Sequence, residues 1–263
     1  MRSARPPRRL SGRDDLALSG GGAYQAVPPP PAYRAPKRFA KPVYLPPMVG
    51  ASQEAQRKMM ETKTAVFVID DSGSLYFGTG GDLTGIRYAA PLSLLGLMRR
   101  AGGGRAGVVH YGSEAPAELV TPLLDVKRNW RQLQNALSIP APSLGGTNVA
   151  SGFVRCADLL AEDPSGQAVV YLIGDGLEAI SPAARQAIDA LPPQSVHLLL
   201  VDRSGACDAV LEAGWRSLPL GSIHRLDVFD TKAMAWQLAE IFASSIGLQM
   251  PSATGPKKAR VKR

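Results

Sequence analysis

The chain has 263 residues, of which 45% are hydrophobic, and this is enough for one large folded domain or two small ones. The net charge of +8 is uneven, because residues 1–60 hold eleven basic and three acidic residues, whereas residues 61–255 hold fourteen basic and nineteen acidic ones. No apolar run approaches the ~18–20 residues of a membrane span. The segment after Arg8-Arg9 is charged where an export signal is apolar, so we expect a cytoplasmic protein.

Residues 1–60 are rich in arginine, proline, glycine and alanine. Such a composition buries too little apolar surface to offset the entropy of ordering, so we predict a disordered basic tail that ends in a short helix from Ala51 to Glu61. The alternative is that Tyr44–Met48 packs on the domain as an extended strand or clamp. We place the folded domain at residues 61–250 and a second basic tail at residues 251–263.

Within residues 61–250, short buried strands alternate with amphipathic helices. The predicted strands are Thr64–Ile69, Ala106–Tyr111, Glu118–Thr121, Ala168–Ile173, Ser195–Val201 and Ser222–Val228. Helices are predicted for Leu83–Arg100, around Trp130 and Leu133, after Thr147, from Ser181-Pro182 and around Leu238. The alternation predicts an α/β fold with a doubly wound, mostly parallel sheet flanked by helices, and such sheets bind ligands at the carboxyl ends of their strands.

The loop after the first strand carries oxygen-bearing side chains at alternate positions, Asp70, Ser72 and Ser74. Alternate positions can turn one carboxylate and two hydroxyls toward one point, and such hard oxygens suit Mg²⁺ or Ca²⁺. Two later segments also lie beside predicted elements. Gly145–Asn148 comes just before a predicted helix, and Gly174–Gly176 follows a predicted strand. They contribute Thr147 and Asp175.

These three segments resemble the metal-ion-dependent adhesion site of the von Willebrand factor A-type domain. That family has an Asp-x-Ser-x-Ser loop, a Thr loop and an Asp loop in this order, here separated by about 75 and 30 residues. The resemblance spans about residues 61–250. It implies a complete site formed by Asp70, Ser72, Ser74, Thr147 and Asp175, with Mg²⁺ (or Mn²⁺ or Ca²⁺) as the cofactor.

The resemblance also implies a function without catalysis, in which an Asp or Glu of a partner protein completes the coordination of the metal. Asp71 fills the variable position of the motif and is expected to point to solvent. Tyr76 and Phe77 belong to an insertion after Ser74, and they either contact the partner from an exposed position or tuck under the loop. Two alternatives stay open: an adaptor for a separate AAA-type ATPase, and nonspecific nucleic-acid binding by basic tails such as residues 257–263.

A hydrolase is disfavoured by the residues themselves. Gly146–Ala150 is similar to the histidine loop of subtilases, but Asn148 stands at the position of the histidine, and no nucleophile loop follows. The three histidines lie in predicted strands, where we expect core or sheet-face positions. A phosphatase would need a carboxylate at Ser72. We therefore predict that the protein is not an enzyme.

Overall fold

The computed structural model describes residues 39–76, 81–138, 143–163, 165–201, 207–226 and 230–252. One six-stranded sheet with the order β3-β2-β1-β4-β5-β6 forms its centre. The strands are β1 Thr64–Asp70, β2 Arg105–Tyr111, β3 Val120–Asp125, β4 Ala168–Gly174, β5 Val196–Val201 and β6 Ser222–Leu226. All neighbours are parallel except β2 and β3, which are antiparallel. The predicted doubly wound, mostly parallel α/β fold is confirmed.

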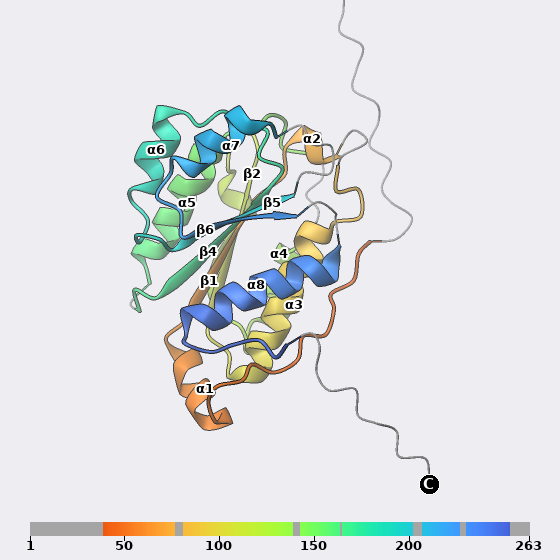
Figure 1. Cartoon of the computed structure of the whole chain (residues 1–263), viewed down its shortest axis with the longest axis vertical. Helices are drawn as coiled ribbons and strands as arrows, with labels where there is room; N and C mark the ends of the chain where they lie inside the picture. Colours follow the sequence, from red (N-terminus) through yellow and green to blue (C-terminus); the bar gives the residue numbers. More distant parts are fainter. Residues whose placement is uncertain are drawn as a thin grey trace, which may run out of the picture. The chain divides into compact units, whose positions relative to one another are not determined.

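Helices cover both faces of the sheet (Figure 1). They are α1 Gln53–Glu61, α2 Gly73–Tyr76, α3 Ile86–Ala101, α4 Trp130–Ala136, α5 Val149–Ala161, α6 Pro182–Ile188, α7 Ala209–Arg216 and α8 Thr231–Ser245, with a 3-10 turn at Ala117–Leu119. Strand β1 is buried along its whole length. Alternate side chains such as Phe67 and Val68 therefore enter two separate cores, one under α3 and α8 and the other under α5, α6 and α7.

The sequence predicted most elements but missed the short helices α2 and α7. Helix α3 begins at Ile86 instead of Leu83, because the Asp82 carboxylate accepts hydrogen bonds from the backbone N–H groups of Ile86 and Arg87 and fixes the helix start there. The helix continues through Pro91, although a proline inside a helix usually kinks or breaks it. Among the described residues, no helix is both long and apolar enough to cross a membrane.

The segment before α1 packs on the domain. Leu45 and Met48 are buried in the core under α3 and α8. The backbone N–H of Val43 donates to Ser93 Oγ at 2.9 Å, and Arg100 Nη2 donates to the carbonyl of Leu45 at 2.8 Å. The predicted disorder is therefore wrong for residues 39–50, because hydrogen bonds with α3 satisfy this proline-rich backbone. The predicted helix from Ala51 to Glu61 is found as α1.

The clamp formed by Tyr44–Met48, which was the alternative, is what the structure shows. Val49 also forms an isolated antiparallel bridge with Gln249, so the segment is held at two places. Residues 1–38 and residues 253–263, where most of the predicted basic tails lie, are outside the described residues.

Candidate metal centre

Two of the predicted site loops leave adjacent parallel strands at the same edge of the sheet. Strand β1 pairs with β4 in the register Ile69↔Ile173, so that Asp70 ends one strand beside the end of the other. Gly174 is needed at this position, because a Cβ added there would lie 2.9 Å from Asp70 Oδ2. This close approach brings Asp175, the next residue, to the edge that Asp70 occupies.

The first loop holds its oxygen atoms close together. The backbone N–H of Ser72 donates to Asp70 Oδ1 at 2.8 Å, and the hydroxyl oxygens of Ser72 and Ser74 are 3.0 Å apart. Asp70 and Ser72 are buried and Ser74 is half-buried. One carboxylate and two hydroxyls therefore share a small volume at the carboxyl end of β1.

Backbone hydrogen bonds join the loop that contains Thr147 to the first loop. The N–H of Gly73 donates to the carbonyl of Gly145 at 2.6 Å, and the N–H of Leu144 donates to the carbonyl of Asp71 at 2.9 Å. Half-buried Thr147 follows directly, two residues after Gly145 and before α5. The structure thus places Thr147 in a segment that is bonded to the Asp70 loop.

Glu178 joins the third loop to the second. Both of its carboxylate oxygens accept hydrogen bonds from the N–H of Val149, the first residue of α5, at 2.8 and 3.1 Å. Within the third loop, Asp175 Oδ1 accepts a hydrogen bond from the N–H of Leu177 at 3.0 Å. Sequence reasoning missed Glu178, because a contact across 29 residues has no local pattern.

The electrostatics of the site show an unbalanced negative charge. Burial and, next in size, the neighbouring Asp175 carboxylate raise the pKa of Asp70 to about 8. The pKa of the Tyr111 hydroxyl is also raised, first by burial and then by the charges of Asp70, Glu178 and Asp175. A carboxyl group in this position takes up a proton near neutral pH unless a cation compensates its charge.

The donor set of this centre fits a hard divalent cation. Two carboxylates with neutral hydroxyl oxygens beside them are ligands that Mg²⁺ and Ca²⁺ prefer. The pKa of Asp70 is raised by burial and then by the charge of Asp175, and a bound cation would offset both effects. In the part of the chain that the structure describes, no group of three or more His, Cys, Asp or Glu side chains could hold a metal ion. A metal here therefore depends on the hydroxyls of Ser72, Ser74 and Thr147.

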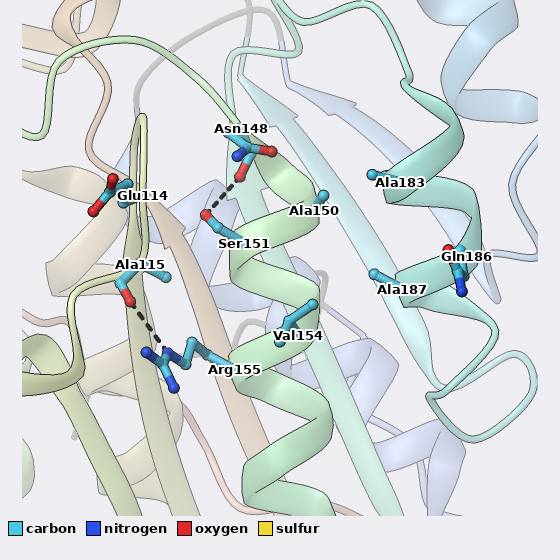
Figure 2. A pocket seen from close by; sticks show the side chains of 10 residues that line it. All are labelled: Glu114, Ala115, Asn148, Ala150, Ser151, Val154, Arg155, Ala183, Gln186 and Ala187. Atoms are coloured by element: carbon cyan, nitrogen blue, oxygen red, sulfur yellow. Dashed lines mark hydrogen bonds between the residues drawn. The ribbon is translucent and has the colours of Figure 1, made fainter. Parts of the chain in front are cut away.

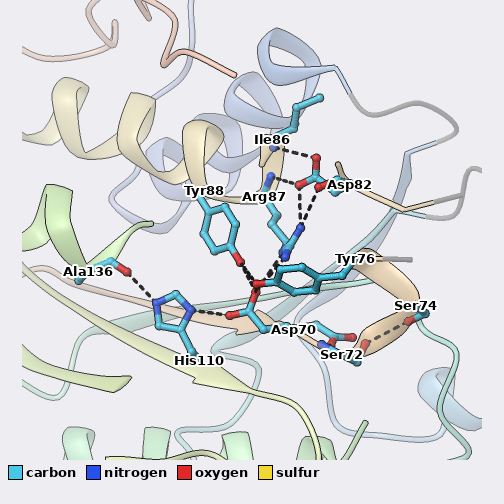
Figure 3. Close-up of polar contacts among 11 residues, drawn as sticks. Asp70, Ser72, Ser74, Tyr76, Asp82, Ile86, Arg87, Tyr88, His110 and Ala136 are labelled. Atoms are coloured by element: carbon cyan, nitrogen blue, oxygen red, sulfur yellow. Dashed lines mark hydrogen bonds and ion pairs between the residues drawn. The ribbon is translucent and has the colours of Figure 1, made fainter. Parts of the chain in front are cut away.

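Asp71 does not point to solvent, so that expectation is wrong. Its side chain is 0% exposed and pairs with Arg87 Nη2 at 3.0 Å and with His110 Nδ1 at 2.6 Å. The hydroxyl of Tyr88 also donates to Asp71 Oδ1. Figure 3 shows Arg87, Tyr88 and His110 gathered beside Asp70. The sequence could not reveal this cluster, because its members come from separate elements.

Tyr76 is buried and follows the alternative in which the ring tucks under the loop. It is 4% exposed, and its hydroxyl lies 3.3 Å from Asp71 Oδ1 and 3.2 Å from the hydroxyl of Tyr88. The guanidinium of Arg87 lies 4.9 Å from the centre of the Tyr76 ring, so a cation–π contact also holds the ring inside. Phe77 lies outside the described residues.

A groove runs beside the site, between α5 and α6 (Figure 2). It begins at Asn148, next to Thr147, and has a volume of about 620 Å³. Its lining includes the small or apolar side chains of Ala150, Val154 and Ala187, and Val154 is 50% exposed. The groove therefore offers an accessible surface next to the candidate metal centre.

Residues 65–178 match the family model of the von Willebrand factor type A domain. None of the curated protein sequences matches the chain significantly. In structure, the chain is similar to the PilB minor pilin from Streptococcus sanguinis, with a TM-score of 0.53, 12% identity and coverage of 75% of this chain and 64% of that chain. It is also similar to the pilus adhesin SpaC from Lactobacillus rhamnosus GG, with a TM-score of 0.53, 17% identity and coverage of 71% and 30%.

The chain thus spans 64% and 30% of the lengths of these two proteins, and the similarity concerns the fold. The matched segment runs from β1 to the loop after β4, so it contains all three loops of the candidate centre. The family match and the observed fold together support a von Willebrand factor type A domain in this chain.

Proposed function

We propose that this domain is a non-catalytic, metal-dependent protein-binding module. Asp70, Ser72, Ser74, Thr147 and Asp175 hold one Mg²⁺ (or Mn²⁺ or Ca²⁺), and an Asp or Glu of a partner protein completes its coordination. The observation that carries this proposal is the convergence of three hydrogen-bonded loops on two carboxylates, one of which, Asp70, has a pKa of about 8. Domains of this family are generally protein-interaction modules, which agrees with the proposal.

The hydroxyl and carboxylate residues have different roles in the proposed site. The neutral hydroxyls of Ser72, Ser74 and Thr147 supply oxygen ligands without further negative charge, so a bound cation keeps part of its positive charge. Asp70 and Asp175 supply the balancing charge from the buried edge of the sheet. When bound, Mg²⁺ supplies a position whose water can be exchanged for a carboxylate.

The positions of the histidines support binding without catalysis. His110 contacts Asp71 and the carbonyl of Ala136, and His197 and His224 both contact Ser222 at the start of β6. None of these described contacts places an imidazole on Ser72 or Ser74, which a serine-based hydrolase at this loop would need as a general base. We keep the cytoplasm as the predicted location.

Partner capture from lysate with and without chelator tests this function. The full chain serves as bait in buffers with 5 mM Mg²⁺ or with EDTA, and Asp70→Ala and Asp163→Asn are the paired variants. Asp163 is a buried aspartate at a distance from the three loops, paired with Arg105 at 3.4 Å. We expect proteins that are retained in Mg²⁺ by the wild type and by Asp163→Asn, and that are lost in EDTA and with Asp70→Ala. Retention that is unaffected by EDTA and by Asp70→Ala would refute metal-dependent binding.

A further inference from the structure

Asp71 has hydrogen-bonding partners on several elements, although it is not one of the predicted metal ligands. Arg87 Nε and Nη2 donate to Asp71 Oδ1 at 3.2 and 3.0 Å, and the hydroxyls of Tyr76 and Tyr88 point to the same oxygen. His110 Nδ1 lies 2.6 Å from the other oxygen, Oδ2. We call Asp71 and these four residues, Tyr76, Arg87, Tyr88 and His110, the anchor cluster. Figure 3 labels the four residues around Asp71.

The anchor cluster surrounds both oxygens of the Asp71 carboxylate with polar groups. His110 Nδ1 lies 2.6 Å from Asp71 Oδ2 and Nε2 lies 2.7 Å from the carbonyl oxygen of Ala136, so contacts on both sides fix the orientation of the ring. Both oxygens of the Asp71 carboxylate therefore have side-chain partners, Arg87 at Oδ1 and His110 at Oδ2.

The backbone of Asp71 connects the cluster to two other parts of the site. Its N–H donates to the carbonyl of Tyr111 at the end of β2, at 2.7 Å, and its carbonyl accepts from Leu144, at 2.9 Å, in the segment that leads to Thr147. The residue is therefore held through its side chain to α3 and β2 and through its backbone to two neighbouring segments. It lies between Asp70 and Ser72, whose positions must be fixed if both are to face one cation.

We propose that Asp71 is a positioning residue, which fixes the Asp70–Ser74 loop against the Thr147 loop before a metal binds. This inference rests on the proposed function, because it assigns the anchor cluster a role in the same site. The side-chain bonds of Asp71 add to the backbone hydrogen bonds that join Asp71 and Gly73 to Tyr111, Leu144 and Gly145. Together these bonds restrict movement of the loop in the absence of a metal.

A purely structural role makes a different prediction from a positioning role. If the cluster only joins α3 to β2, its loss lowers stability without affecting the loop in the molecules that stay folded. If Asp71 positions the loop, its loss also weakens metal binding and loosens the loop in the absence of metal. A comparison of the cluster variants with a control variant that loses a similar free energy of unfolding separates the two roles.

The test uses the full chain with Asp71→Asn, Tyr88→Phe and the control Phe242→Leu. Tyr88→Phe removes one hydroxyl donor and keeps the ion pair between Asp71 and Arg87. Phe242 is a fully buried residue of α8, so its substitution lowers stability without removing any hydrogen bond of the anchor cluster. Two quantities are measured: the Kd for Mn²⁺, from electron paramagnetic resonance of the free ion, and the amide hydrogen exchange of Ser72 and Gly73 in EDTA.

We expect Asp71→Asn to raise the Kd for Mn²⁺ by about 10- to 100-fold, as with other residues that orient metal ligands. Tyr88→Phe should produce a smaller change in the same direction. Both should accelerate exchange at Ser72 and Gly73, whose N–H groups bond Asp70 and Gly145, whereas Phe242→Leu should leave the Kd and the relative protection of these amides unchanged.

Kd values and exchange rates of both cluster variants that match those of Phe242→Leu would overturn the inference. If Asp71→Asn fails to fold, Tyr88→Phe decides by the same two measurements. If the wild type binds no Mn²⁺, the proposed function fails. The exchange measurement in EDTA then decides the positioning role alone, with unchanged protection of Ser72 and Gly73 overturning it.

Discussion

Replacing Asp70 by Asn should stabilise the metal-free domain, and the size of the gain follows from the burial of this carboxyl group. The pKa of Asp70 is about 8 in the folded chain, whereas the ordinary value that applies to the unfolded chain is 3.8. Between these values the unfolded state is ionised and the folded state holds a proton, so the contribution of Asp70 to stability is highest below pH 4 and falls as the pH rises toward 8. At about 1.4 kcal/mol for each pH unit, the loss at pH 7 is about 4 kcal/mol.

Asp70→Asn removes this cost and keeps an oxygen that can accept the hydrogen bond from the N–H of Ser72. In EDTA at pH 7 we therefore expect a gain of up to about 4 kcal/mol, or about 8–16 °C in Tm for a domain of this size. The gain should shrink to about zero at pH 4. In excess Mg²⁺ the wild type should be more stable than Asp70→Asn, because only the wild type gains stability from the bound metal.

Urea denaturation in EDTA at several pH values between 4 and 8 measures this difference. The matched control is Asp163→Asn, because Asp163 is buried but its carboxylate has Arg105 and the hydroxyl of Ser165 as partners. Its substitution should not stabilise the protein at any pH. An Asp70→Asn variant that is less stable than the wild type in EDTA at pH 7, or a gain that is independent of pH, would refute the reasoning.

Three further predictions concern the surroundings of the site. Glu178→Ala should cost about 0.5–2 kcal/mol of stability in urea denaturation, because it leaves the N–H of Val149 without its cap. It should also raise the Kd for Mn²⁺, and an unchanged Kd would mean that the contact is only structural. Burial lowers the pKa of His197 to about 4, so stability should fall as the pH drops from 6.5 to 4, and His197→Gln should flatten this part of the profile. Leu45→Ala should destabilise the domain by about 2–5 kcal/mol, and a loss below about 0.5 kcal/mol would show that the clamp is dispensable.

The fold could be predicted because its strands are short, apolar and bounded by turns. Val66 and Val68 belong to a run that is buried on both faces of the sheet, and β4 has the same character, so both strands were found from composition alone. Helix α7 was missed, because it has only eight residues, of which Trp215 alone is buried, and its apolar period is too short to recognise. The Asp208 cap was its only clear local signal.

The candidate site was predictable only as far as its residues lie in local motifs. Asp70, Ser72 and Ser74 are close in the chain, and the parallel pairing of β1 with β4 brings Asp175 to the same edge. The burial of Asp71 depends on Arg87 and His110, which lie on other elements. The clamp at residues 44–48 was misjudged for a similar reason, because its partners on α3 follow 50 residues or more later in the chain.

The most direct test of the proposed metal centre is Mn²⁺ binding by the full chain and by a Ser72→Ala/Ser74→Ala double variant. The substitution removes two hydroxyl oxygens that are 3.0 Å apart and leaves both carboxylates in place. Titration calorimetry should show one Mn²⁺ site in the wild type and a Kd at least about 10-fold higher in the double variant. Equal binding by the two proteins, or no binding by the wild type, would contradict a metal centre formed by these loops.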